Sequence, residues 1–103
     1  MWAQLITARL KAGHEGDLGR LIEQLQATEQ PGSGLVRSTA MQDQKDPNKV
    51  SFLVVFESEA AARARENDSR RQEGMQAARA TMAEIFDGPP EFVDLTVVAE
   101  FTP

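Results

Sequence analysis

Apolar residues between positions 50 and 56 predict a β-strand that is apolar on both faces. Side chains of a strand point alternately to its two sides. One face carries Val50, Phe52, Val54 and Phe56, and the other carries Leu53 and Val55. Such a strand must be covered on both sides, but the chain has only enough helical sequence to cover one face of a small sheet. The pattern therefore predicts that a second copy of the chain covers the other face.

Three further elements precede this strand. Residues 2–10 predict a first strand, which ends at the turn Lys11–Gly13. From residue 17 onward, apolar residues recur at i, i+3, i+4 and i+7, as is typical of an amphipathic helix. They are Leu18, Leu21, Ile22 and Leu25. The helix ends before the breaker Pro-Gly-Ser-Gly at residues 31–34, and residues 35–42 predict a second strand, which the polar loop 43–48 joins to the third.

The segment that follows residue 56 predicts a helix in two parts. Ser58 is placed to cap a first part over residues 59–66, because its hydroxyl can accept a hydrogen bond from a free backbone N–H of the first turn. Asn67 and Asp68 interrupt the helix. The spacing of Ser69 and Gln72 predicts a capping box that starts the second part. The buried stripe of this second part comprises Met75, Ala78, Met82, Ile85 and Phe86.

A last strand is predicted over residues 92–101, after the breaker Gly88-Pro89-Pro90. One of its faces is apolar throughout, and we expect that face to pack beneath the helices. It comprises Val93, Leu95, Val97, Ala99 and Phe101. The order strand, helix, strand, strand, helix, strand is that of a ferredoxin-like α+β fold with a broken second helix. A chain of this length suits one domain over residues 1–103.

The strand faces also predict a homodimer. The first strand has a mixed face, which comprises Trp2, Gln4, Ile6 and Ala8. In the third strand, Phe52, Val54 and Phe56 would leave an apolar patch exposed on a monomer. We therefore expect two sheets to pack together and to enclose a shared, partly polar interior.

Composition excludes several classes of partner. No apolar run approaches the roughly 20 residues of a membrane-spanning helix, and the N-terminus shows no basic leader or cleavage site. We expect a cytoplasmic protein without a membrane partner. A formal charge of -5 argues against a nucleic-acid surface. The one basic cluster, Arg63, Arg65, Arg70 and Arg71, alternates with acidic residues, and we interpret it as a solvated helix surface.

The sequence predicts no resident cofactor or metal. Without cysteine there is no thiolate nucleophile and no cysteine-bound zinc or iron–sulfur cluster. His14 is the only histidine, and it lies in a Gly-rich turn, where we interpret it as a solvated loop residue rather than a general base. Beside Glu15 and Asp17 it also makes a poor metal site, since three converging ligands are usually required.

Three segments together resemble the antibiotic-biosynthesis-monooxygenase family. They are PGSGL after the first helix, VVFESEAAARARENDSRRQEGM across the third strand and the broken helix, and GPPEFVDLTVVAEF at the end. The resemblance covers nearly the whole chain. It implies a homodimeric α/β barrel, in which two ferredoxin-like sheets pack face to face and enclose ligand pockets. It also implies either cofactor-independent oxidation of aromatic polyketides or haem degradation.

The sequence departs from the patterns of both activities. Where many members have Trp at the end of the third strand, this chain has Phe56. Where haem-degrading members have Asn in the first strand, it has Ala8, and the helix segment 71–76 that would carry their iron-binding histidine holds none. These departures argue against haem degradation by this chain.

The resemblance and the strand faces together predict a site for a small apolar or aromatic metabolite. We expect its walls to be Trp2, Ile6, Phe52 and Phe56. Cofactor-free oxygenation needs a polar group to help deprotonate the substrate and donors for its oxyanion, and the strand residues Arg37, Asp94 and Thr96 are candidates. For each of the three, a strand-edge or dimer salt bridge is the alternative. For the protein, the alternative to a monooxygenase is a non-catalytic ligand-binding or interaction domain.

Overall fold

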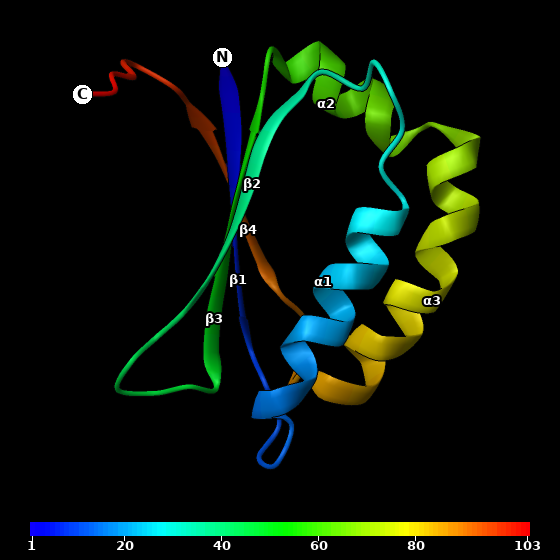
Figure 1. Ribbon diagram of the computed structural model, residues 1–103, viewed down its shortest axis with the longest axis vertical. Coiled ribbons are helices and arrows are strands. Elements are labelled where there is room, and N and C mark those ends of the chain that lie inside the picture. The colour runs from blue at the N-terminus through cyan, green and yellow to red at the C-terminus, as the bar shows by residue number, and fades with distance from the viewer.

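The computed structural model describes residues 1–103 and has the predicted order of elements (Figure 1). The strands are β1 (Trp2–Arg9), β2 (Leu35–Gln42), β3 (Lys49–Phe56) and β4 (Glu91–Thr96). The helices are α1 (Leu18–Ala27), α2 (Glu59–Glu66) and α3 (Ser69–Ile85), and a 3-10 turn over Glu15–Asp17 leads into α1. The α+β fold and the broken second helix are thereby confirmed.

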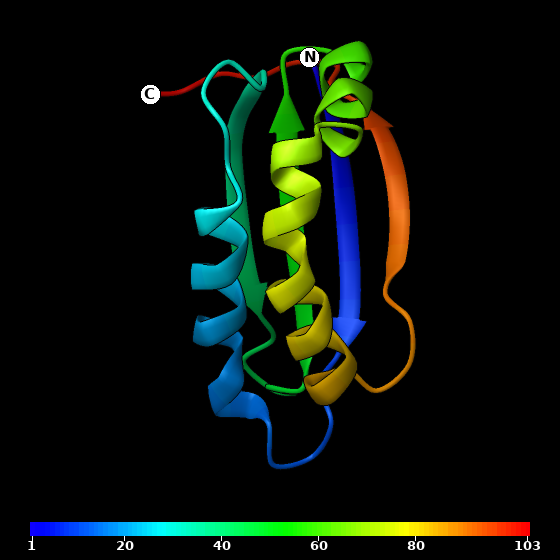
Figure 2. The same cartoon turned by 90° about the vertical axis from the view of Figure 1, so that its right-hand side faces the viewer.

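The four strands form one antiparallel sheet in the order β2-β3-β1-β4. Helices α1 and α3 lie side by side over one face of this sheet, and α2 lies at one end of that face (Figures 1 and 2). We call this the helix face. No helix covers the opposite face, which we call the open face. No helix of the chain is long and apolar enough to cross a membrane.

Strand register decides which side chains lie beneath the helices, and it reverses two predictions. Trp2 pairs with Phe56 of β3 and with Thr96 of β4, so these residues share one face. Phe56 and the other apolar residues of its face are buried against the helices within one chain, and the prediction that they form a dimer interface is wrong. The apolar residues of β4, Val93 and Leu95, lie instead on the open face and are exposed.

Strand β4 ends at Thr96 rather than at residue 101 because its partner strand ends there. Thr96 already pairs with Trp2, the first residue of β1, and beyond it the Val97 N–H donates to the carbonyl of Met1 at 3.3 Å. The remaining tail leaves the sheet, with Val98 and Phe101 more than 90% exposed.

Helix starts follow from capping side chains. The Ser58 hydroxyl accepts from the Ala61 N–H at 3.0 Å, as predicted for α2. Helix α3 is capped by Asp68, whose carboxylate accepts from the Arg70 N–H at 2.9 Å, so the prediction that Ser69 is the cap is wrong. A carboxylate one residue earlier offers a stronger acceptor to the free N–H groups of the first turn.

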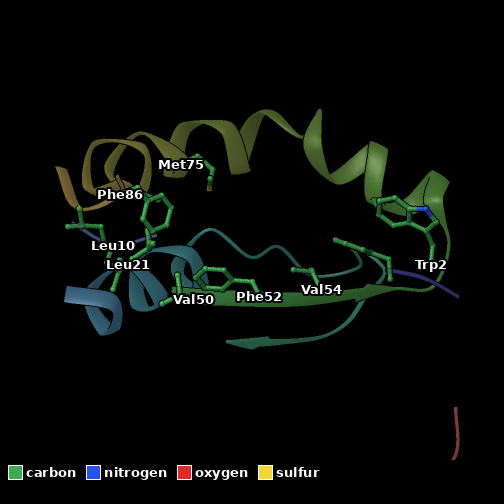
Figure 3. Close-up of a cluster of buried hydrophobic side chains, with 12 residues drawn as sticks. Trp2, Leu10, Leu21, Val50, Phe52, Val54, Met75 and Phe86 are labelled. Carbon is green, nitrogen blue, oxygen red and sulfur yellow. The ribbon is translucent and has the colours of Figure 1, made fainter. Parts of the chain in front are cut away.

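The most deeply buried core side chains lie at the end of the sheet where β1 ends (Figure 3). Leu10, Leu21, Val50 and Ile85 are almost fully buried there. Trp2 lies at the opposite end, beneath α2 (Figure 3). Between the two ends, Phe52 and Val54 of β3 lie opposite α3.

Candidate functional site

A cavity of about 280 Å³ lies between the helix face of the sheet and the three helices. Twelve of its 18 lining residues are hydrophobic. In Figure 3, Phe52 and Val54 from the sheet and Met75 from α3 lie on opposite sides of this space. The cavity is therefore a mostly apolar space between the two layers, of the kind that holds small apolar ligands.

The four predicted wall residues, Trp2, Ile6, Phe52 and Phe56, all line this cavity. They come together because the register pairs Trp2 with Phe56 and Ile6 with Phe52 on adjacent strands. The two aromatic rings of the first pair lie 6.0 Å apart and are tilted by 45°. The site thus lies within one chain, beneath the helices, and not between two sheets as the strand faces suggested.

Five lining residues carry polar groups into this apolar space: Gln4, Ser38, Arg65, Glu66 and Arg71. Arg65 is the most firmly held of them. Its Nε and Nη2 atoms donate to Glu29 Oε2 at 3.1 and 2.9 Å, and its guanidinium lies 5.4 Å from the centre of the Phe56 ring. The charge of Arg65 is therefore already matched within the chain.

Arg71 differs from Arg65 because it has no partner. Its side chain makes no hydrogen bond and no ion pair within the chain, and its Nε atom is shielded from solvent. Burial is the main cause that lowers the pKa of Arg71, and the positive charge of Arg65 lowers it further, while the carboxylates of Glu29 and Glu66 act in the opposite direction. Guanidinium groups nevertheless stay protonated in proteins, so Arg71 gives the cavity wall a positive charge that no carboxylate of the chain binds directly.

Arg63 covers the end of the cavity that Trp2 lines. Its guanidinium lies 5.1 Å from the centre of the Trp2 ring and donates to Asp94 Oδ2 at 3.1 Å. Asp94 also accepts from Gln4 Nε2 at 3.0 Å. The candidate Asp94 thus joins α2 to β4 and β1 at the rim of the cavity, but it does not line the cavity itself.

The structure does not bring the three polar candidates together. Arg37 lies on the open face, where it forms an ion pair with Glu100 of the C-terminal tail. Thr96 is exposed at the end of β4. Neither residue lines the cavity, so the polar groups within reach of a ligand there are those of Gln4, Ser38, Arg65, Glu66 and Arg71.

The donors around the cavity do not fit a histidine-bound haem or a metal site of several carboxylate or histidine ligands. No group of three or more His, Asp or Glu side chains in the chain is arranged to hold a metal. Helix α3 presents Met75 and Met82 to the cavity and has no histidine. His14 lies outside the cavity, in the loop before α1, with its Nδ1 atom 2.7 Å from Asp17 Oδ2.

Sequence reasoning missed the two arginines of the cavity wall. The interpretation of the basic cluster as a solvated surface holds for Arg70, which is exposed, and in part for Arg63, which is half-buried, and it is wrong for Arg65 and Arg71. The side chain of Arg65 is only 16% exposed. The predicted break between the two helices could have indicated this. Arg65 and Arg71 lie in different helices, so the spacing within one helix does not decide which way they face.

Comparison with known proteins gives a family match and several similar folds. The antibiotic biosynthesis monooxygenase family model matches residues 1–81. The chain is 20% identical to the NE2512 protein of unknown function from Nitrosomonas europaea, with a TM-score of 0.75, 99% of this chain covered and 93% of that chain. PA3566 from Pseudomonas aeruginosa is 16% identical, with a TM-score of 0.70 and coverage of 95% and 94%.

A third solved structure, of an antibiotic biosynthesis monooxygenase, is 17% identical to this chain, with a TM-score of 0.71 and coverage of 96% and 100%. Identities this low show a shared fold. The comparison with curated proteins gives no match.

Proposed function

The chain belongs to the antibiotic biosynthesis monooxygenase family, and from this premise we propose that it binds an apolar ring compound in the cavity between the sheet and the helices and oxidises it with molecular oxygen. The observation that carries the proposal is the cavity itself. Its volume of about 280 Å³ is at the lower end for small-molecule sites, and its walls are mostly apolar with a few polar groups.

The oxidation needs no group beyond the substrate and oxygen. An anthrone-like substrate, ionised to its enolate, supplies the electrons itself. Its methylene carbon loses two hydrogens and gains one oxygen atom, while the second oxygen atom leaves as water, so that CH₂ and O₂ give C=O and H₂O. The chain's part is to bind the rings, keep water away from the reacting carbon and hold polar donors near the substrate oxygen.

Binding can be tested with the neutral dye N-phenyl-1-naphthylamine, which fluoresces in apolar surroundings. We expect the dye to bind, and we expect Val54→Phe to abolish binding because the added ring occupies the cavity. Met41→Phe is the matched control, since it adds a ring on the open face. Equal binding by both variants would show that the dye does not enter the cavity.

Oxygen uptake tests the reaction. With an anthrone as substrate, the rate should rise with pH as the substrate ionises, and Val54→Phe should abolish it. The purified protein should show neither haem nor flavin absorbance and no stoichiometric metal. If the dye binds but no ionisable aromatic compound is consumed, the non-catalytic ligand-binding alternative replaces the monooxygenase.

We further propose that the protein is a homodimer in which two open faces pack together to form an α/β barrel. The support is the set of exposed apolar side chains on that face, which includes Met41, Val93 and Leu95. A sheet covered by helices on one side leaves its other side to be covered or solvated. Light scattering across a wide dilution range tests the proposal, and a folded monomer at micromolar concentration would contradict it.

A further inference from the structure

Two hollows of the molecule share one wall. The inner one is the apolar cavity described above. The outer one is a polar cleft of about 200 Å³ between the loop over residues 30–34 and the junction of α2 with α3. In Figure 1 this loop runs from α1 past that junction toward β2. Arg65 and Arg71 line both hollows, so they form the boundary between an apolar space and a polar one.

Of the three arginines that line the two hollows, Arg71 alone lacks a carboxylate partner; the carboxylate of Glu57, which lines the outer cleft, also has no partner within the chain. Arg65 donates two hydrogen bonds to Glu29. In the outer cleft, the carboxylate of Asp68 binds the guanidinium of Arg70 through both of its oxygens. In the inner cavity, Glu66 accepts from Arg63 at 3.2 Å.

No carboxylate forms an ion pair with Arg71, although those of Glu29 and Glu66 are close enough to raise its pKa, and its Nε is buried without an acceptor. A buried donor that lacks a partner destabilises a protein unless something else binds it. An oxyanion from outside the chain is the acceptor whose geometry a planar guanidinium fits best, through two parallel hydrogen bonds.

We propose that Arg71 binds an oxyanion substituent of the ligand, such as a carboxylate or sulfonate, while the ligand's rings occupy the inner cavity. This inference rests on the proposed function and narrows the ligand to an apolar ring acid. The substituent lies at the boundary wall and faces the outer cleft, where the chain's own polar groups and water can solvate its remaining oxygens. A neutral ring compound of equal size lacks the hydrogen bonds between Arg71 and the oxyanion.

Two dyes that differ only in one sulfonate test the proposal. They are 8-anilinonaphthalene-1-sulfonate and its neutral parent N-phenyl-1-naphthylamine. We expect the sulfonate to bind about tenfold more tightly, since a charge-assisted hydrogen bond to a partly buried arginine has about this effect. Arg71→Gln should remove the tenfold preference and leave the affinity for the neutral dye unchanged.

Arg79→Gln is the matched control, because it removes the same charge from the same helix and Arg79 lines neither hollow. It should leave both affinities unchanged. Val54→Phe should abolish binding of both dyes, which locates them in the inner cavity. Arg71→Gln should also unfold at the same temperature as the parent chain or higher, because it removes a buried donor that has no partner.

The outcomes separate this inference from the function on which it rests. If neither dye binds in the cavity, the proposed function fails. If the neutral dye binds there but the sulfonate binds no more tightly, the function stands and the role of Arg71 is refuted. The same refutation follows if Arg71→Gln weakens both dyes equally, or if it lowers the unfolding temperature by several degrees, since either result indicates a structural arginine.

Discussion

Gly34 holds the loop over residues 30–34 against α2, and its substitution by alanine should destabilise the protein strongly. Its backbone has φ of +81°, and a Cβ atom added there would lie 2.6 Å from the Cβ of Ala61. Its carbonyl accepts from the Glu57 N–H at 2.9 Å, which fixes the loop to the end of β3. Neither the loop nor the helix can therefore move away freely.

Gly32 provides a matched control for this substitution. Its φ is +75°, but no atom lies within 4 Å of a Cβ added there. Gly32→Ala should thus lower the free energy of unfolding by only about 1 kcal/mol, because alanine is strained in the left-handed conformation. Gly34→Ala should cost about 3 kcal/mol, because overpacking adds roughly 2 kcal/mol to the conformational term.

Thermal unfolding followed by circular dichroism distinguishes the two variants. For a domain of this size 1 kcal/mol corresponds to roughly 4–8 °C, so the melting temperature of Gly34→Ala should fall by more than about 12 °C, and that of Gly32→Ala by about a third as much. Adding Ala61→Gly to Gly34→Ala should restore part of the loss, although a glycine in α2 alone costs about 1 kcal/mol. Equal losses for both variants would refute the contact between the loop and α2.

Three more substitutions test other parts of the structure. Leu95→Lys on the open face should convert the dimer to a folded monomer in light scattering, and an unchanged mass with intact folding would exclude this face as the interface. Phe56→Asp should destabilise the chain by about 4 kcal/mol or more, because the carboxylate would be buried without a partner; unchanged denaturant unfolding would contradict the register. Burial raises the pKa of Glu29, but hydrogen bonds from Ser33 and Arg65 outweigh it and hold the pKa below its ordinary value. The stability that Glu29 contributes is therefore present above its ordinary pKa and lost as pH falls through the lowered one. Glu29→Gln should be less stable than the parent at pH 7 and equal to it in strong acid, and a constant difference between the two would contradict this linkage.

Much of the fold could be predicted from local patterns. Helix α2 spans residues 59–66, as the Ser58 cap indicated, and β3 ends at Phe56 as alternation indicated but begins one residue earlier than predicted, at Lys49. The orientation of β4 could not be predicted in this way. Alternation places its apolar residues on one face of the strand but does not decide whether that face lies beneath the helices or on the open side. Pairing with β1 decides the side, and the mixed face of β1 lies beneath the helices because Trp2 and Ile6 are on it.

The candidate site was predictable only in its apolar walls. Trp2, Ile6, Phe52 and Phe56 line the cavity because bulky apolar side chains on one face of neighbouring strands must meet. The charged lining depends on where α2 turns into α3, and residue spacing does not give that angle. Arg65 and Arg71 therefore looked like surface residues in the sequence.

The central claim is that a ligand enters the cavity between the sheet and the helices, and methionine methyl resonances test it most directly. The chain has four methionines. Met75 and Met82 line the cavity, whereas Met41 lies on the open face. With ¹³C-methyl methionine and 8-anilinonaphthalene-1-sulfonate, we expect large shifts and ligand contacts for Met75 and Met82 and none for Met41. Shifts confined to Met41 would place the ligand on the open face and contradict the claim.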